Sequence, residues 1–154
     1  MTWVVNGLKD SLVYFGVKNT QTNQIDYFKI TDHNRAPLQI SIQRIENSKR
    51  TANGTMRKNI IAEKHNFSLS WSDVPNTSTY TVDGGYGASQ IYDFYMDQKQ
   101  PFYVKFTQKF DSDATSDQIY VVQFTSCSFD IVKRNPSGTN PYIRMNLNIS
   151  LEEV

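Results

Sequence analysis

The feature that most constrains the fold is a long run near the C-terminus in which apolar and polar residues alternate strictly. Its apolar members are Ile143, Met145, Leu147, Ile149 and Leu151, and its polar members are Arg144, Asn146, Asn148, Ser150 and Glu152. Successive side chains of a β-strand point to opposite faces of a sheet, so this run predicts a long strand with one buried face. The turn-forming residues 135–138 connect it to an earlier apolar run, which predicts a long hairpin.

The earlier run, residues 118–133, changes the phase of its alternation partway along. Apolar residues first occupy even positions (Tyr120, Val122, Phe124) and then odd ones (Cys127, Phe129, Ile131). A regular strand would turn its core face outward at this change. The pattern therefore predicts either a β-bulge or a bend that carries the strand from one sheet to another.

Alternation predicts further strands at residues 38–43, 67–71 and 102–107. Residues 46–54 are expected to form a polar connection, in which the Asn53-Gly54 pair is a hairpin signal, and residues 55–61 then return as a strand. Residues 80–82 are expected to be a short extended piece. Residues 1–37 form either short strands, around 14–15 and 27–30, or an N-terminal arm.

One segment has the pattern of a helix, from Ala88 to Gln98. Ala88, Ile91, Tyr92 and Tyr95 fall on one helical face, and Pro101 prevents much further extension. The sequence thus predicts a mainly β fold with one helix, an antiparallel β-sandwich or small barrel in a single domain over residues 1–154.

The composition fits a folded domain with 38% hydrophobic, 20% charged and 13% aromatic residues. The net charge of +1 does not favour a nucleic-acid or membrane partner. A single cysteine, Cys127, cannot form an internal disulfide, which fits folding in a reducing compartment such as the cytoplasm. The N-terminus lacks the pattern of a signal peptide, and no run has the length of a transmembrane helix.

Residues with catalytic potential do not form a recognised motif. His33 and His65 have no metal-ligand spacing to other residues and are expected to be solvated. The acidic loop 111–117 lacks the glycine and distal glutamate of a calcium loop. We therefore expect no enzyme activity, no cofactor and no metal.

Charge is distributed unevenly along the chain. Residues 44–65 carry six basic and two acidic residues, a local charge of +4, whereas residues 83–98 carry only acidic charge, including Asp93 and Asp97. These segments are either ordinary solvated loops or complementary surfaces, with a basic hairpin of one subunit docking on the acidic face of a neighbour. A nucleic-acid role for the basic segment is less favoured, because it lacks interleaved aromatic residues.

Residues 32–35, 44–57 and 62–75 contain the motifs R-T-A-N-G-T (50–55) and F-S-x-S-W-x-x-x-P (67–75). With the Asp83-Gly84-Gly85 turn and the following helix carrying Phe94-Tyr95, this pattern resembles the tail-tube and tube-like minor tail proteins of long-tailed bacteriophages. The resemblance covers about residues 32–106.

This resemblance implies a structural virion protein that forms stacked, hexameric rings around a channel through which viral DNA passes. It implies as partners further copies of the chain and other tail proteins. The subunit interface would then include Arg44, Glu46, Lys49, Arg50, Asn53, Arg57, Lys58, Asp93 and Asp97, while Arg144, Asn146 and Asn148 would face the lumen.

Two alternatives remain open at the level of sequence. A tail-tip or baseplate ring protein would share the same fold. A carbohydrate-binding β-sandwich could use Trp3, Trp71 or exposed tyrosines as sugar platforms, although Trp71 is in phase with Phe67 and Leu69 and is expected to lie in the core.

Overall fold

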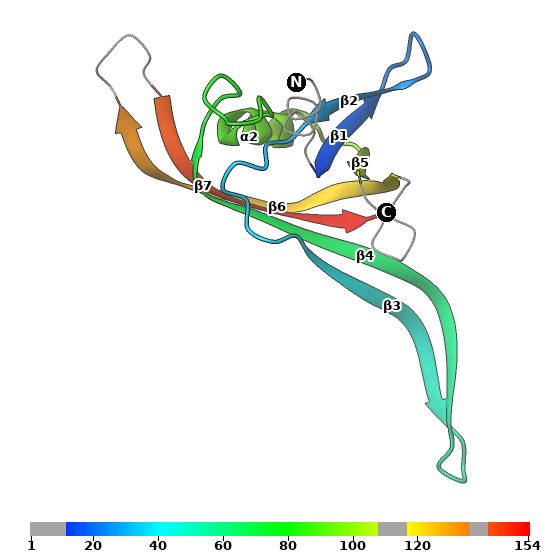
Figure 1. Ribbon diagram of the computed structural model, residues 1–154. Helices are drawn as coiled ribbons and strands as arrows, with labels where there is room; N and C mark the ends of the chain where they lie inside the picture. Colours follow the sequence, from blue (N-terminus) through cyan, green and yellow to red (C-terminus); the bar gives the residue numbers. More distant parts are fainter. Residues whose placement is uncertain (1–11, 108–116, 136–141) are drawn as a thin grey trace, which may run out of the picture.

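The computed structural model describes residues 12–107, 117–135 and 142–154 and shows a mainly β protein with one helix in this part of the chain (Figure 1). This confirms the predicted fold class. The elements are β1 (Val13–Lys18), β2 (Ile25–Lys29), β3 (Gln39–Arg50), β4 (Met56–Pro75), α2 (Ala88–Asp97), β5 (Phe102–Phe106), β6 (Gln118–Asn135) and β7 (Tyr142–Glu153).

The seven strands form a single antiparallel sheet in the order β2-β1-β5-β6-β7-β4-β3. The chain that leaves β2 nevertheless reaches β4, which is five positions away in this order. There Arg35 forms an isolated β-bridge with Trp71, and the Ala36 N–H donates to the Ser70 carbonyl over 2.8 Å. In a flat sheet, strands so placed would be about 24 Å apart. The sheet is therefore rolled into a partly closed barrel, so of the two predicted architectures the small barrel describes it better.

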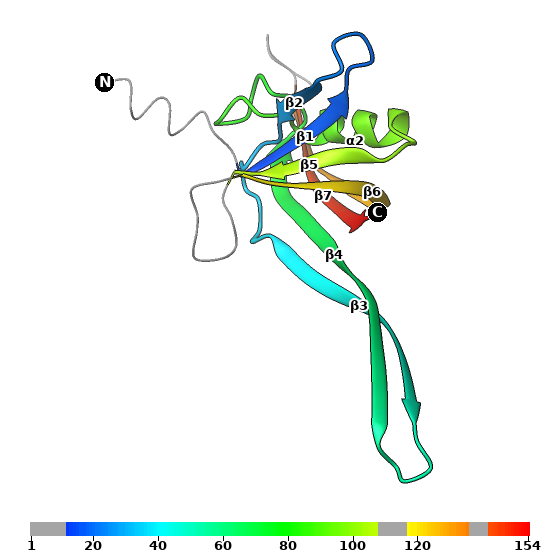
Figure 2. The same ribbon diagram turned by 90° about the vertical axis from the view of Figure 1, so that its right-hand side faces the viewer.

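The core occupies the concave side of this rolled sheet, and α2 lies across it (Figure 2). Ala88 and Ile91 of the helix are fully buried, and the Phe94 ring contacts Phe15 and Phe102 at centroid distances of 5.5 and 5.0 Å. All four apolar residues from Met145 to Leu151 in the C-terminal alternating run are buried, as the pattern predicts.

Local features of the strands agree with most sequence expectations. The pairing of β6 with β7 shifts register between Phe124 and Ser126, which confirms the bulge predicted from the change of phase. β1 and β2 confirm the short-strand alternative for residues 13–29, whereas residues 1–11 lie outside the described residues. Three expectations were wrong. Residues 46–50 continue strand β3 and are not part of a polar connection, because they pair with β4. Residues 80–82 lie in turns, and the two strands expected over 55–71 are one continuous strand, β4.

The most unusual feature is a long ribbon, residues 42–65, formed by most of β3, the following turn and the first half of β4, which we call the arm. Pairing of β4 with β7 begins only at Asn66, so the arm strands pair with each other alone. The arm projects away from the rest of the molecule, which we call the body (Figures 1 and 2). Gly54 adopts a φ of 86° at its tip, a left-handed conformation that explains the Asn-Gly signal.

Candidate subunit interface

The arm has two chemically different faces. Directly opposed residues in an antiparallel pair share a face, and successive residues of β3 alternate between faces. Even-numbered β3 residues and their partners form a paired face, where Arg44 contacts Glu63 at 2.9 Å and Lys58 contacts Glu46 at 3.5 Å. The charges on this face largely neutralise one another.

The opposite face, which we call the basic face, carries Lys49 directly across from Arg57, and Gln43 across from Lys64. It has no carboxylate, because both acidic residues of the arm lie on the paired face. A shallow groove near the tip is lined in part by Asn47, Lys49, Arg57 and Asn59, all members of the basic face. The positive charge predicted for this segment is therefore concentrated on one side of the ribbon.

The arm also exposes apolar side chains that a solvated hairpin does not need. Large apolar residues with at least 42% of their surface exposed are Ile42, Ile45, Met56, Ile60 and Ile61. Ile61 has no partner in the register because the ladder shifts between Ile45 and Glu46. An isolated two-stranded ribbon is marginally stable in water, so these exposed residues make the arm a candidate contact surface.

The root of the arm is fixed to the end of β7. His65 contributes both its backbone N–H and its ring Nδ1 to Glu153 Oε2, at 2.9 and 2.7 Å, and Lys64 Nζ donates to the Val154 carbonyl. Burial alone would raise the pKa of the Glu153 carboxyl, but the His65 hydrogen bonds and the charges of His65 and Lys64 lower that pKa below its ordinary value. His65 is thus a half-buried anchoring residue, and the expectation that it is simply solvated was wrong.

A second feature lies on the body, between β2 and α2. Here a pocket is lined by Phe28, Tyr86, Gln90, Asp93, Phe94 and Asp97. The Phe28 and Tyr86 rings stack at 4.7 Å, and Phe94 meets Phe28 edge-on at 5.0 Å. We call this the acidic aromatic pocket, since Asp93 and Asp97 are its exposed acidic members.

The position of Tyr86 is set by a turn that is bound to the chain after β2. The Asp83 carboxylate accepts hydrogen bonds from the Thr31 hydroxyl, the Asp32 N–H and the Gly85 N–H at 2.8 to 3.0 Å. Burial alone would raise the Asp83 pKa, but these donors lower it. The backbone of Tyr86 then bonds to Lys29 and Thr31, which holds its ring against Phe28.

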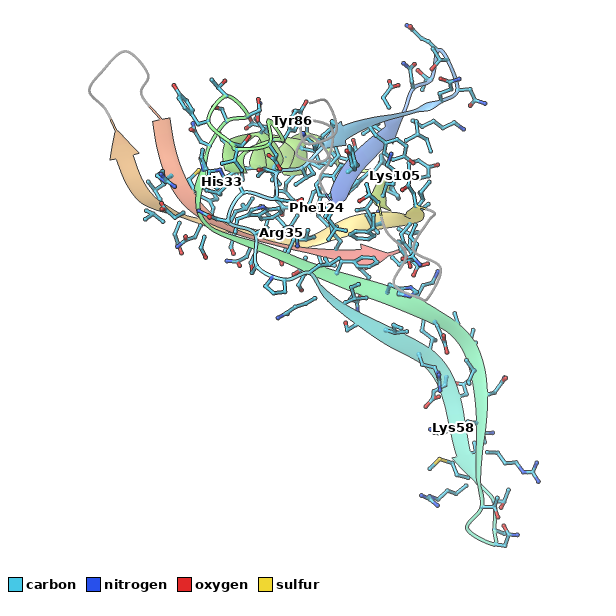
Figure 3. All side chains as sticks on the ribbon, in the orientation of Figure 1. His33, Arg35, Lys58, Tyr86, Lys105 and Phe124 are labelled. Atoms are coloured by element: carbon cyan, nitrogen blue, oxygen red, sulfur yellow. The ribbon has the colours of Figure 1, made fainter. Side chains whose placement is uncertain are left out.

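The predicted basic and acidic interface residues lie far apart within one molecule. Figure 3 shows Lys58 on the distal arm and Tyr86 beside the helix of the body. No ion pair between the arm and α2 exists among the described residues, so any contact between the two surfaces must involve two copies. Arg50 and Asn53 lie at the arm tip, where Arg50 donates to the Gly54 carbonyl at 3.0 Å.

The three residues predicted to face a lumen lie on the convex face of β7. Asn148 is exposed, whereas Arg144 forms an ion pair with Asp73 at 2.9 Å and Asn146 accepts the Asp73 N–H at 2.9 Å. Asp73 adopts a φ of 53° where β4 shifts register, and these contacts hold it there. The lumen assignment of these residues stays a prediction.

The sequence reasoning missed Phe28 and Tyr86 as site residues, since their turn and strand positions carry no periodic signal. It also missed Glu153, which lies 88 positions from His65.

Trp71 is buried as expected, and its Nε1–H donates to the Thr31 carbonyl at 2.8 Å, so it cannot serve as a sugar platform. Trp3 lies outside the described residues. Within the described residues there is no cluster of three potential metal ligands, and no helix is long and apolar enough to cross a membrane.

No family model matches the sequence, and no curated protein matches it. A solved structure that is similar in shape is the tail of an empty GTA particle, reconstructed with C6 symmetry. That comparison covers 92% of this chain and 90% of the other, with a TM-score of 0.46 and 7% sequence identity. A likeness at this level does not assign a function.

Proposed function

We propose that this chain is a structural subunit of a bacteriophage tail tube, with no catalytic role, that assembles into stacked hexameric rings around a DNA-conducting channel. The observation that carries the proposal is the arm, which extends beyond the body with five exposed large apolar side chains and one face that carries basic but no acidic residues. A surface of this kind is stabilised when a partner covers it. The phage-tail assignment itself rests on the sequence resemblance in residues 32–106.

The ends of the sheet support self-assembly of a head-to-tail type. β2 and β3 are its two edge strands, and each presents unpaired backbone groups that can extend a sheet into a neighbouring copy. The surfaces are different, so the contact would be heterologous, and such contacts close into rings when the rotation permits. A tip or baseplate ring protein would use the same contacts and is the alternative position in the tail.

The convex face of β7 is compatible with a channel for DNA. Arg144 there is paired with Asp73 and therefore adds no net charge, while Asn148 is polar and uncharged. A lining with little net positive charge does not retain the phosphate backbone, whose attraction to proteins is dominated by Lys and Arg. The folded chain would be made in the host cytoplasm and reside in the virion tail.

The test is to compare the intact chain with a variant lacking the arm. Residues 46–61 are replaced by Asn-Gly, because Ile45 and Ala62 are directly opposed and a two-residue turn can join them. Both proteins are measured by sedimentation velocity and negative-stain imaging over a wide concentration range. Stacked hollow rings of the intact chain, lost in a variant that remains folded, support the proposal; an intact chain that stays monomeric overturns it.

A further inference from the structure

The acidic aromatic pocket contains two carboxylates that have no cationic partner among the described residues of a single copy. Asp93 and Asp97 stand one helical turn apart on α2, and neither forms an ion pair with the described residues. Like charges at this spacing destabilise a helix by a few tenths of a kcal/mol. Asp97 is also the last residue of a helix whose last turn contains no basic residue, where the helix dipole disfavours negative charge.

Beside these carboxylates lies a surface suited to a planar cation. Phe28 and Tyr86 are half-buried and stacked at 4.7 Å, so part of this aromatic pair faces the pocket. A guanidinium group binds an aromatic surface and a carboxylate at the same time, because it is planar and carries a fork of N–H donors. An arginine side chain therefore fits the pocket better than a lysine, an amide or a neutral ring.

The arm offers such a side chain. Arg57 is exposed on the basic face, directly opposite Lys49, and has no acidic neighbour on that face. Arg44, by contrast, is held by Glu63, and Arg50 donates to a carbonyl at its own turn. Arg57 is thus the arm arginine that forms neither an ion pair nor a side-chain hydrogen bond with the described residues.

We propose that Arg57 of one copy occupies the acidic aromatic pocket of a second copy, with its guanidinium against Phe28 and Tyr86 and its donors on Asp93 or Asp97. Lys49, across the ribbon, neutralises the remaining carboxylate. The inference rests on the proposed function for the existence of an assembly, and it adds which two surfaces meet and by what chemistry. Salt weakens the contact, since both partners start from exposed positions.

The first test compares Arg57→Gln with Lys58→Gln, which remove the same charge from neighbouring residues on opposite faces. The sequence resemblance includes Lys58 in the interface, but Lys58 pairs with Glu46 on the paired face and therefore takes no part in the contact proposed here. We expect Arg57→Gln to raise the concentration at which assembly begins by roughly tenfold or more, as removal of a central arginine does in interfaces. Lys58→Gln should change that concentration much less. Equal effects of the two substitutions would overturn the assignment of the basic face, while leaving self-assembly established.

The second test exchanges the charges across the contact. Arg57→Glu places a carboxylate against the acidic pocket, and Asp93→Arg with Asp97→Arg places Arg57 against a basic pocket, so neither protein should assemble alone. In an equimolar mixture the side chain at position 57 of each protein meets a pocket of opposite charge in the other, and assembly should return. If the mixture stays dissociated although circular dichroism shows that both proteins are folded, the pocket proposal is wrong. If the intact chain never assembles, the proposed function is wrong as well.

Discussion

The rings of Phe67 and Phe106 lie 5.0 Å apart although β7 and β6 separate their strands in the sheet. In a flat sheet, strands three positions apart would be about 14 Å from each other. The contact therefore depends on the rolling of the sheet, and it brings the first half of the chain against the second. Both residues are fully buried, so this pair is a sensitive measure of whether the barrel is closed.

Truncating this pair should destabilise the body strongly. Phe67→Ala and Phe106→Ala are each expected to lower the free energy of unfolding by about 3–5 kcal/mol, through lost burial and the cavity left behind. A double-mutant cycle in urea should show a coupling of about 0.5–1.5 kcal/mol between the rings. Met56→Ala, on the exposed arm, is the control and should change stability by about 0.5 kcal/mol or less. Strict additivity of the two Phe substitutions would contradict direct ring contact.

The hydrogen bond from Trp71 to the Thr31 carbonyl should contribute to closing the barrel. Trp71→Phe keeps an aromatic ring but leaves that buried carbonyl without its donor, which costs about 1–3 kcal/mol. The free energy of unfolding of the two proteins, measured in urea, checks this. The amides of Ala36 and Ser72 form hydrogen bonds across the same junction. A loss of stability no larger than the smaller ring explains, with unchanged hydrogen exchange at these two amides, would contradict a role of the Trp71 hydrogen bond in closing the barrel.

Gly16 should not tolerate a side chain. A Cβ there would lie 2.6 Å from Tyr27 Cδ1 and 2.7 Å from Ile25 Cγ2, because both side chains pass over the glycine from β2. Gly16→Ala is expected to destabilise the protein by about 1–3 kcal/mol through overpacking. Adding Tyr27→Ala should make the alanine at position 16 less harmful than it is in the wild-type background. An unchanged penalty would show that Tyr27 is not the obstacle.

The contact between His65 and Glu153 should make stability depend on pH. The folded-state pKa of Glu153 is lowered below its ordinary value near 4.5, so its contribution is present above that value. It should be lost as the pH falls from about 4.5 through the folded-state pKa, where the carboxyl takes up a proton. The difference in unfolding free energy between wild type and Glu153→Gln, measured from pH 7 to pH 3, should shrink over this window. A difference that grows on acidification would contradict the assignment.

Local patterns in the amino-acid sequence predict much of the fold. Alternation over residues 143–151 and the change of phase between Phe124 and Cys127 predict β7 and the β6 bulge, because burial on one face of a strand imposes a period of two. The Asn53-Gly54 pair predicts the arm turn, because Gly54 adopts the positive φ that this turn requires. The uneven distribution of charge also points to the arm and α2 as candidate interface segments.

The tertiary structure alone decides how these elements come together. Rolling of the sheet depends on contacts between distant residues such as Phe67 and Phe106, which leave no periodic trace in the sequence. The register of β3 with β4 separates Arg57 from Lys58 into opposite faces, although they are adjacent in the chain. The acidic aromatic pocket likewise forms only when β2, the turn at Tyr86 and α2 meet, so no segment read by itself contains it. Sequence determines which faces are apolar or charged, whereas packing determines which of those faces meet and which remain open to a partner.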